Sequence, residues 1–235
     1  LKAGYRAIDT AAIYQNEEAV GVAIKDSGIP REEIFVTTKV WNSDQGFDNT
    51  LRAFETSLGK LGLEYVDLYL THWPKPTLAE TYKAIERLYE EKLIRVPGVS
   101  NHHQHHLEDI FAVANVKPMV NQFECHPSLS QDSLRAFCAQ HNIAVTAWAP
   151  LGTGIVFTHP VVKQLAEKYG KTVAQIVLRW HLEIGNIAIP KSVTPERIKE
   201  NLDVFNFSLQ TDEVAAITAL NTFHRTASDP DNFDF

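Results

Sequence analysis

The chain has 235 residues, of which 44% are hydrophobic and 22% charged, and its formal net charge is −7. This composition is typical of a globular protein that buries a core, and the acidic balance argues against a nucleic-acid or anionic-membrane partner. No apolar run is long enough to span a bilayer, and neither Cys125 nor Cys138 belongs to a C-x-x-C pair, so we expect two free thiols in a reducing cytoplasm. We also expect a monomer.

Strand and helix patterns alternate along the whole chain. The predicted strands are 5–9, 34–40, 66–72, 94–100, 119–124, 143–149 and 187–191. Most of them are nearly continuous apolar runs, as expected for parallel strands that are covered on both faces. Apolar residues at helical spacing, preceded by capping residues such as Asn16 and Thr172, predict at least one helix after every strand.

The spacing of these strands is that of an α/β protein with a (β/α)8 TIM barrel. The strand ends carry Asp9, Lys39, His72, Ser100, Gln122, Trp148 and Lys191. A barrel needs eight strands, and the sequence supplies seven. Residues 1–4 resemble the end of a helix that Gly4 terminates, so the first βα unit is expected to be missing. We therefore predict a single barrel domain over 1–235 that is truncated at its N-terminus.

Four polar side chains are expected at one rim of this barrel: Asp9, Tyr14, Lys39 and His72. Active sites of such barrels lie at the carboxyl ends of the strands. A free tyrosine, with a pKa of about 10, is too weak an acid at neutral pH, but a nearby ammonium lowers that pKa. The set is suited to donate a proton to a developing alkoxide. The alternative is a purely structural ion pair between Lys39 and Asp9.

Two nucleotide-binding motifs are not supported. No G-x-G-x-x-G occurs, which disfavours a Rossmann dehydrogenase. Residues 185–192 imitate a P-loop, but Pro190 replaces the second glycine and has no N–H to offer a phosphate. An NTPase is therefore rejected.

A cluster of histidines and one cysteine invite a functional interpretation. The histidines are His102, His103, His105 and His106. Imidazoles bind transition metals, but no H-E-x-x-H pattern accompanies them, so we interpret the segment as a helix start and predict no metal site. Cys125 stands beside His126 without a recognisable triad partner, which favours a packed thiol over a nucleophile.

The motifs together resemble those of the aldo/keto reductase family, close to its small prostaglandin F synthase-like and 2,5-diketogluconate reductase-like members. They are GYRAIDTA at 4–11 with Tyr14, TTKVW at 37–41, HWP at 72–74, GVSN at 98–101, VNQ at 120–122, AWAPLG at 147–152, and IPKS at 189–192 followed by Arg197 and Asn201. The match extends over the whole chain. It departs from the family pattern at Ala149, where serine is common.

The resemblance implies an NADPH-dependent oxidoreductase that reduces a small-molecule aldehyde, ketone or quinone. Tyr14 would be the general acid, Lys39 and Asp9 its tuning pair, and His72 the partner that orients the substrate. The alternative is a catalytically weak NADPH-binding or redox-sensing module of the same fold. Trp41 and Trp73 would form an apolar pocket wall. The short loop after His72 predicts an open pocket.

The resemblance also implies which residues hold the cofactor, NADPH or NADP+. Ser100, Asn101 and Gln122 would bind the nicotinamide carboxamide, and Trp148 would stack on its ring. Leu151, Gly152 and Thr153 would follow the pyrophosphate. Lys191, Ser192 and Arg197 would bind the 2′-phosphate, with Asn201 at the adenine, since Arg and Lys are suited to phosphate oxygens.

Overall fold

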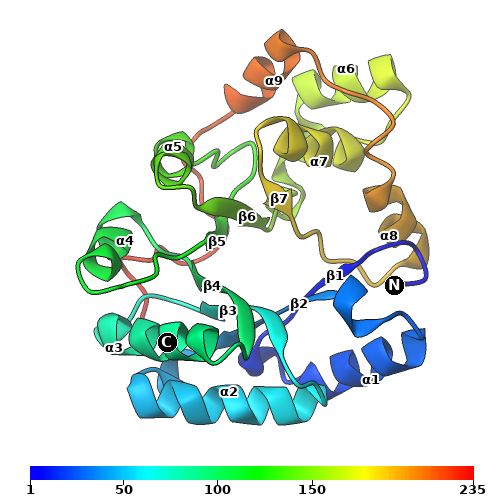
Figure 1. The fold of residues 1–235 in the computed structure, drawn as a ribbon. Helices are drawn as coiled ribbons and strands as arrows, with labels where there is room; N and C mark the ends of the chain where they lie inside the picture. Colours follow the sequence, from blue (N-terminus) through cyan, green and yellow to red (C-terminus); the bar gives the residue numbers. More distant parts are fainter. The chain divides into compact units, whose positions relative to one another are not determined.

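The computed structural model describes residues 1–235 and contains seven strands, each followed by helical structure (Figure 1). The strands are β1 (Ala7–Asp9), β2 (Phe35–Val40), β3 (Val66–Thr71), β4 (Ile94–Ser100), β5 (Val120–Glu124), β6 (Ala144–Trp148) and β7 (Ile187–Ala188). All seven predicted strands are therefore present, although the last, predicted over 187–191, is only two residues long.

Nine α-helices connect or follow these strands. They are α1 (Glu17–Ser27), α2 (Phe47–Leu61), α3 (Leu78–Glu90), α4 (Gln104–Phe111), α5 (Asp132–Gln140), α6 (Pro160–Tyr169), α7 (Val173–Glu183), α8 (Pro195–Leu202) and α9 (Thr211–Thr218). Short 3-10 turns stand at η1 (Ala12–Tyr14), η2 (Arg31–Glu33), η3 (Asn42–Asp44) and η4 (Gly152–Thr158). None of the helices is both long enough and apolar enough for a membrane span.

The residues form two compact units. Unit 1 comprises Leu1–Asn121 together with Asp234–Phe235, and unit 2 comprises Gln122–Phe233. Both units contain parallel strands and helices, as the alternating pattern predicts. The extent of the barrel as one domain stays a prediction.

Unit 1 is built on parallel strands in the order β1-β2-β3-β4. Asp9 pairs with Thr37, Lys39 with Leu70, and Leu70 with Gly98. Parallel neighbours in this register end at the same edge of the sheet. The polar residues at the ends of β1, β2 and β3 are therefore brought together by strand pairing alone.

A buried carboxylate fixes the opposite, amino-terminal part of these strands. Asp67 in β3 is fully buried and accepts hydrogen bonds from Val36 N (2.9 Å), Arg31 Nη2 (2.8 Å) and Arg95 Nη1 (2.8 Å). Because both carboxylate oxygens are paired, the charge is compensated within the fold. This network joins the start of β2 to β3 and β4, and it leaves the carboxyl edge for other chemistry.

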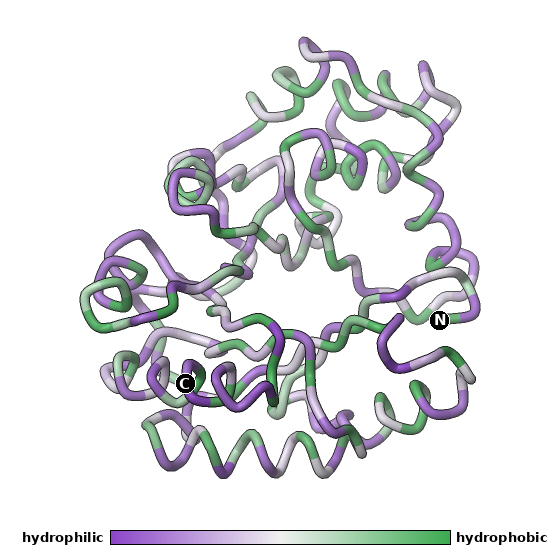
Figure 2. The backbone as a smooth tube through the Cα atoms, in the orientation of Figure 1, coloured by the Kyte–Doolittle hydropathy of each residue, from purple (hydrophilic) through white to green (hydrophobic).

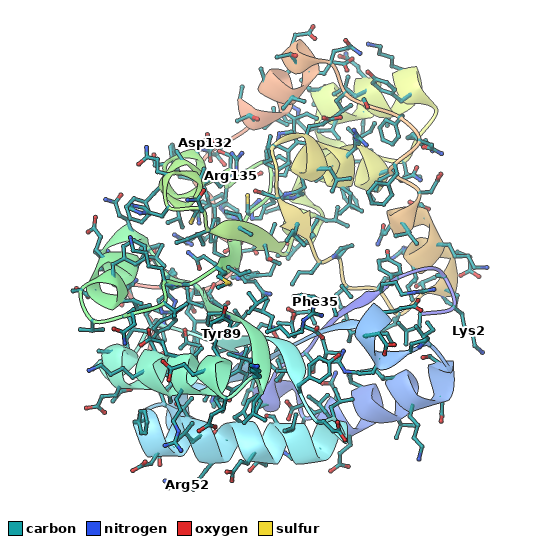
Figure 3. All side chains as sticks on the ribbon, in the orientation of Figure 1. Lys2, Phe35, Arg52, Tyr89, Asp132 and Arg135 are labelled. Carbon is teal, nitrogen blue, oxygen red and sulfur yellow. The ribbon has the colours of Figure 1, made fainter.

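Helices α1 and α2 pack against each other through one face, and polar and apolar residues alternate along their turns (Figure 2). Phe54 and Leu61 of α2 are buried, whereas Arg52 lies on the solvent side of the same helix (Figure 3). This is the amphipathic arrangement that the helical spacing predicts.

Unit 2 has a smaller sheet and relies more on side chains between helices. Strands β6 and β7 pair in parallel, and Trp180 of α7 is fully buried with its Nε1 donating to Thr218 Oγ1 (3.0 Å). Arg135 lies on α5 near Asp132 (Figure 3) and donates to Ile184 O (2.8 Å). The guanidinium therefore fastens α5 to the segment between α7 and β7.

The contact of α1 with α2 depends on a glycine. A Cβ atom at Gly21 would lie 2.1 Å from the carbonyl oxygen of Leu61, which is backbone and cannot turn aside. Gly59 on α2 has nothing within 4 Å of the same position. An added methyl group would therefore meet backbone at the buried Gly21 and nothing at the exposed Gly59.

We predict that Gly21→Ala destabilises the protein, whereas Gly59→Ala stabilises it by about 0.5–1 kcal/mol because alanine is the better helix former. At Gly21 the overlap costs on the order of 1–3 kcal/mol, which outweighs that gain. Urea unfolding of the two variants and the parent measures both effects. Equal stability of the two variants would contradict the close approach of the helices.

Candidate active site

The carboxyl edge of unit 1 is centred on a buried ion pair. Lys39 is fully buried in β2, and its Nζ donates to Asp9 Oδ1 and to Thr10 O (2.9 Å). The Asp9 side chain, at the end of β1, keeps 15% of its surface exposed. Burial lowers the pKa of Lys39, and the Asp9 carboxylate opposes that shift. The contact between Lys39 and Asp9 is the one expected from the sequence.

Tyr14 stands beside this pair, at the end of η1. Its loop is closed by a hydrogen bond from Thr10 Oγ1 to Asn16 Oδ1 (2.6 Å). Lys39 Nζ lies 5.2 Å from the centre of the Tyr14 ring. The ring meets His72 edge-on at a centroid distance of 5.6 Å. The phenol, the ammonium and the imidazole are thus neighbours in one unit.

The expected lowering of the Tyr14 pKa is not found in the protein alone. Partial burial, together with the negative charge of Asp9, raises the pKa of Tyr14 to about 12. The physical reason is that partial burial disfavours the charged phenolate, and the Asp9 carboxylate repels it further. The expectation was wrong because it considered the Lys39 cation and left out the burial of the phenol and the charge of Asp9.

His72 is held as a neutral imidazole. The residue is 7% exposed, and its ring lies edge-on to Trp41 at 5.1 Å as well as to Tyr14. Burial, followed by the nearby Lys39 charge, lowers the pKa of His72 to about 3. Its Nδ1 is buried without a hydrogen-bond partner in the protein. Such an unsatisfied group is costly unless a ligand or water completes it.

An aromatic wall adjoins His72. Phe235 stacks on Trp41 at a centroid distance of 5.9 Å and meets Trp73 edge-on at 5.2 Å. Asn42 Nδ2 also donates to Phe235 O (3.0 Å). The two tryptophans lie near His72 as predicted, and Phe235 packs against both of them. The open pocket stays a prediction. Sequence reasoning missed Phe235, for which the only signal was an aromatic residue in a polar tail.

Two of the residues expected to bind the nicotinamide carboxamide belong to the same edge. Ser100 and Asn101 follow one another at the end of β4, and both are almost completely buried. Asn101 Nδ2 donates to His72 O (3.0 Å) and to Ser100 Oγ (3.3 Å). Asn101 has a φ of 64°, a left-handed conformation that asparagine tolerates. The amide is thereby fixed next to the backbone of His72.

The remaining cofactor candidates lie in unit 2. Gln122 is buried in β5, and Trp148 is half-buried at the end of β6. After Leu151, the φ angles of Gly152, Thr153 and Gly154 are 53°, 52° and 92°. Successive N–H groups in such turns form concavities that bind anions. This backbone is suited to a pyrophosphate.

A buried acid and imidazole support this loop, and the sequence did not reveal them. A Cβ atom at Gly152 would lie 3.0 Å from the His126 ring, so only glycine fits there. His126 Nε2 lies 3.0 Å from Glu124 Oε1, which also accepts from Thr226 N (2.7 Å) and Oγ1 (2.6 Å). Cys125, which lies between these two residues in the chain, is fully buried with a free thiol, so the prediction of a packed thiol is confirmed. Burial also raises the pKa of this thiol to about 12.

The basic candidates lie around the start of α8. Lys191 and Arg197 are exposed, and Ser192 Oγ accepts from Thr194 N (3.2 Å). Asn201 is half-buried in the last turn of the same helix. A helix N-terminus with two cations favours phosphate groups. The donors of unit 2 therefore fit a dinucleotide phosphate chemically.

Comparison with known proteins identifies the family to which this chain belongs. A sequence model of the Aldo/keto reductase family matches residues 1–222. The chain belongs to the aldo/keto reductase family. Its residues are 53% identical to a 9,11-endoperoxide prostaglandin H2 reductase of Trypanosoma cruzi, covering 99% of this chain and 84% of that protein. They are 51% identical to a glyoxal reductase of Bacillus subtilis, covering 100% and 86%.

Solved structures agree with this assignment to the aldo/keto reductases. MGS-M4, an aldo-keto reductase enzyme from a Medee basin deep-sea metagenome library, is 48% identical with a TM-score of 0.98, over 100% of this chain and 88% of that one. A Bombyx mori aldo-keto reductase in complex with NADP is 40% identical with a TM-score of 0.93, over 98% and 83%.

The family assignment confirms three predictions from the sequence. Aldo/keto reductases are (β/α)8 barrels and NADP-dependent oxidoreductases, so the fold class, the enzyme class and the cofactor NADPH/NADP+ agree with those predicted. The cytoplasmic location and the monomeric state stay predictions.

We predict that the neutral His72 makes the fold sensitive to acid. The unfolded chain binds a proton at this imidazole below a pH of about 6.5, whereas the folded protein does so only near 3. This stabilising term is complete above pH 6.5 and is lost as the pH falls. The free energy of unfolding should therefore drop between pH 7 and pH 5 by up to about 2 kcal/mol more in the parent than in His72→Gln.

Urea titrations of both proteins at the two pH values measure this difference. The other buried histidines are present in both proteins, so their contributions cancel. An identical pH dependence of the two proteins would show that His72 titrates normally in the fold.

Proposed function

We propose that this chain reduces aldehydes, ketones or quinones to alcohols with NADPH, using Tyr14 as the general acid. The observation that carries the proposal is the buried Lys39–Asp9 pair with Tyr14 and a neutral His72 beside it. A phenol, a cation and an imidazole at one rim of a barrel form a proton-donating site. NADPH, when bound, supplies the hydride that reaches the carbonyl carbon.

Tyr14 gives its proton to the carbonyl oxygen. A pKa of about 12 keeps the phenol protonated at neutral pH, so Tyr14 carries its proton before the reaction begins. Proton transfer becomes favourable as the oxygen develops alkoxide character, because an alkoxide is a stronger base than a phenolate. Lys39 then stabilises the phenolate that remains, while Asp9 holds the ammonium in place.

His72 orients the same oxygen. A neutral imidazole can donate one ring N–H to the carbonyl without competing with Tyr14 as the acid. The Asn101 bond to the His72 carbonyl and the Trp41 ring restrict its position. Preorganised donors of this kind stabilise charge that develops in the transition state.

The cofactor contacts are proposed from the chemistry of each segment. The polar groups of Ser100, Asn101 and Gln122 suit a carboxamide, and Trp148 suits an aromatic ring. The turn at Leu151, Gly152 and Thr153 suits a pyrophosphate. The cations of Lys191 and Arg197, with Ser192, suit the 2′-phosphate, and Asn201 suits the adenine.

The aromatic wall favours a small substrate. Trp41, Trp73 and Phe235 pack on one another next to His72, so little space for a bulky group lies on that side. The Bacillus subtilis relative bears the name glyoxal reductase. Small dicarbonyl compounds are therefore the first substrates to test.

The second candidate is a catalytically weak NADPH-binding or redox-sensing module. The packing of Phe235 on both tryptophans favours it, because His72 beside this wall is only 7% exposed. Tight NADPH binding together with negligible turnover of several small aldehydes, ketones and quinones would support this candidate. Substrate-dependent NADPH oxidation would exclude it.

We predict that Tyr14→Phe lowers kcat for a small dicarbonyl by about 10²–10⁴-fold, because the proton donor is lost while the ring is kept. NADPH binding should remain, since the hydroxyl is not proposed to contact the phosphates. Absorbance of NADPH follows turnover, and fluorescence follows binding.

Tyr89→Phe is the matched control. Tyr89 lies on α3 (Figure 3), outside the edge that carries Tyr14, and its variant should keep the parent rate. Full activity of Tyr14→Phe would overturn the assignment of the acid. Absence of turnover in the parent would overturn the reductase itself.

We predict that Arg197→Gln lowers the affinity for NADPH by about 10–100-fold and leaves the affinity for NADH nearly unchanged. The reason is that only NADPH carries the 2′-phosphate, which the charged hydrogen bond of Arg197 would hold. Lys199→Gln, two residues further along α8, is the control, and its affinities for NADPH and NADH should both stay close to those of the parent. Titrations with both cofactors measure the ratio. Equal losses of affinity for NADPH and NADH would show that Arg197 does not contact the 2′-phosphate.

A further inference from the structure

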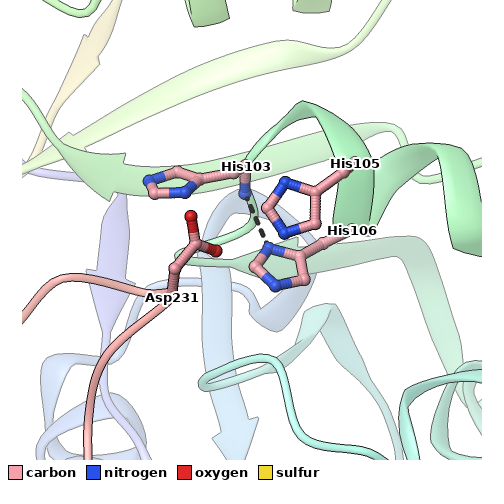
Figure 4. Close-up of side chains that lie close together, drawn as sticks. All are labelled: His103, His105, His106 and Asp231. Carbon is pink, nitrogen blue, oxygen red and sulfur yellow. Dashed lines mark hydrogen bonds between the residues drawn. The ribbon is translucent and has the colours of Figure 1, made fainter.

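Three imidazoles gather at the start of α4. His103 precedes the helix, and His105 and His106 lie in its first turn (Figure 4). Their candidate ligand nitrogens lie within 4.8 Å of one another. The rings of His105 and His106 are 3.9 Å apart, and His103 lies 6.1 Å and 5.9 Å from them. The function proposed above uses none of these side chains.

We propose that His103, His105 and His106 bind one divalent late transition-metal ion, of the class of Zn²⁺, Ni²⁺ or Cu²⁺. Imidazole nitrogen is a preferred ligand of these ions. A metal–nitrogen bond of about 2.0–2.1 Å places neighbouring ligand nitrogens roughly 3.3 Å apart. The three nitrogens need to close by at most about 1.5 Å from their present spacing, which rotation about the side-chain torsions achieves.

The fourth histidine of the sequence cluster does not take part. His102 is fully buried, and its Nδ1 lies 2.7 Å from Ser100 O. Its Nε2 lies 3.4 Å from Thr71 Oγ1. Both ring nitrogens therefore face the interior of unit 1. His103 and His106 are half-buried and His105 is exposed, so an ion can reach the other three from solvent.

Metal binding competes with a helix-capping bond. The backbone N–H of His103 donates to Nδ1 of His106 (3.1 Å), which needs the Nδ1 lone pair (Figure 4). A metal at Nδ1 takes that lone pair, and a metal at Nε2 leaves a proton on Nδ1. In either case the capping bond is lost. The positive end of the helix dipole also disfavours a cation, so all three nitrogens are needed.

The test is a titration of the metal-free full chain with Ni²⁺ in the absence of cofactor, with the heat of binding measured by calorimetry. The parent should bind one equivalent, and Mg²⁺, which prefers oxygen ligands, should not compete. His105→Gln and His106→Gln should each lose at least about tenfold in affinity. His224→Gln, a change at an exposed histidine of the tail, should bind as the parent does.

Two results would overturn the site. One is the absence of saturable Ni²⁺ binding by the parent, and the other is unchanged affinity in either cluster variant. As an independent readout, titration with diamagnetic Zn²⁺ should change the amide resonance of His103 as metal binds, because its hydrogen-bond acceptor is removed. Matching thermal unfolding of the variants without metal would show that the losses do not come from misfolding.

Discussion

The buried contact between Lys39 and Asp9 is the constraint on which the active edge depends. A fully buried ammonium is tolerated only when an opposite charge and further hydrogen bonds compensate it. Asp9 and the Thr10 carbonyl provide both, and they can do so only because β1 and β2 run in parallel with their carboxyl ends aligned. Any change that separates the two strands leaves a buried charge without a partner.

One cation shapes the state of three neighbouring groups. Lys39 helps to keep His72 neutral, compensates Asp9, and stands next to the Tyr14 ring. Partial burial, and after it the charge of Asp9, makes the phenol a weaker acid than a free tyrosine. The pair therefore holds a protonated acid and a neutral hydrogen-bond donor side by side, which is the combination that carbonyl protonation requires.

The pyrophosphate-binding candidates of unit 2 depend on the backbone conformation of the turn after Leu151. The left-handed residues after Leu151 lie over the buried His126, and Glu124 links that imidazole to Thr226 of the tail. Removing the carboxylate would loosen two segments at once. This shared support gives a structural reason for a buried acid and imidazole next to the loop.

Strand periodicity in the sequence was sufficient to find all seven strands, and their order was sufficient to bring Asp9, Lys39 and His72 together. The reason is that parallel neighbours end at one edge, so position in the chain translates into position in space. Three features were decided only by the tertiary structure. The hydrogen bond from Asn42 to Phe235 joins residues 193 positions apart in the sequence, and the one from Thr226 to Glu124 joins residues 102 positions apart. Local sequence patterns do not predict contacts at such separations. The pKa of Tyr14 is raised because the fold partly buries the phenol and places it near the Asp9 carboxylate, and packing, not residue order, decides both.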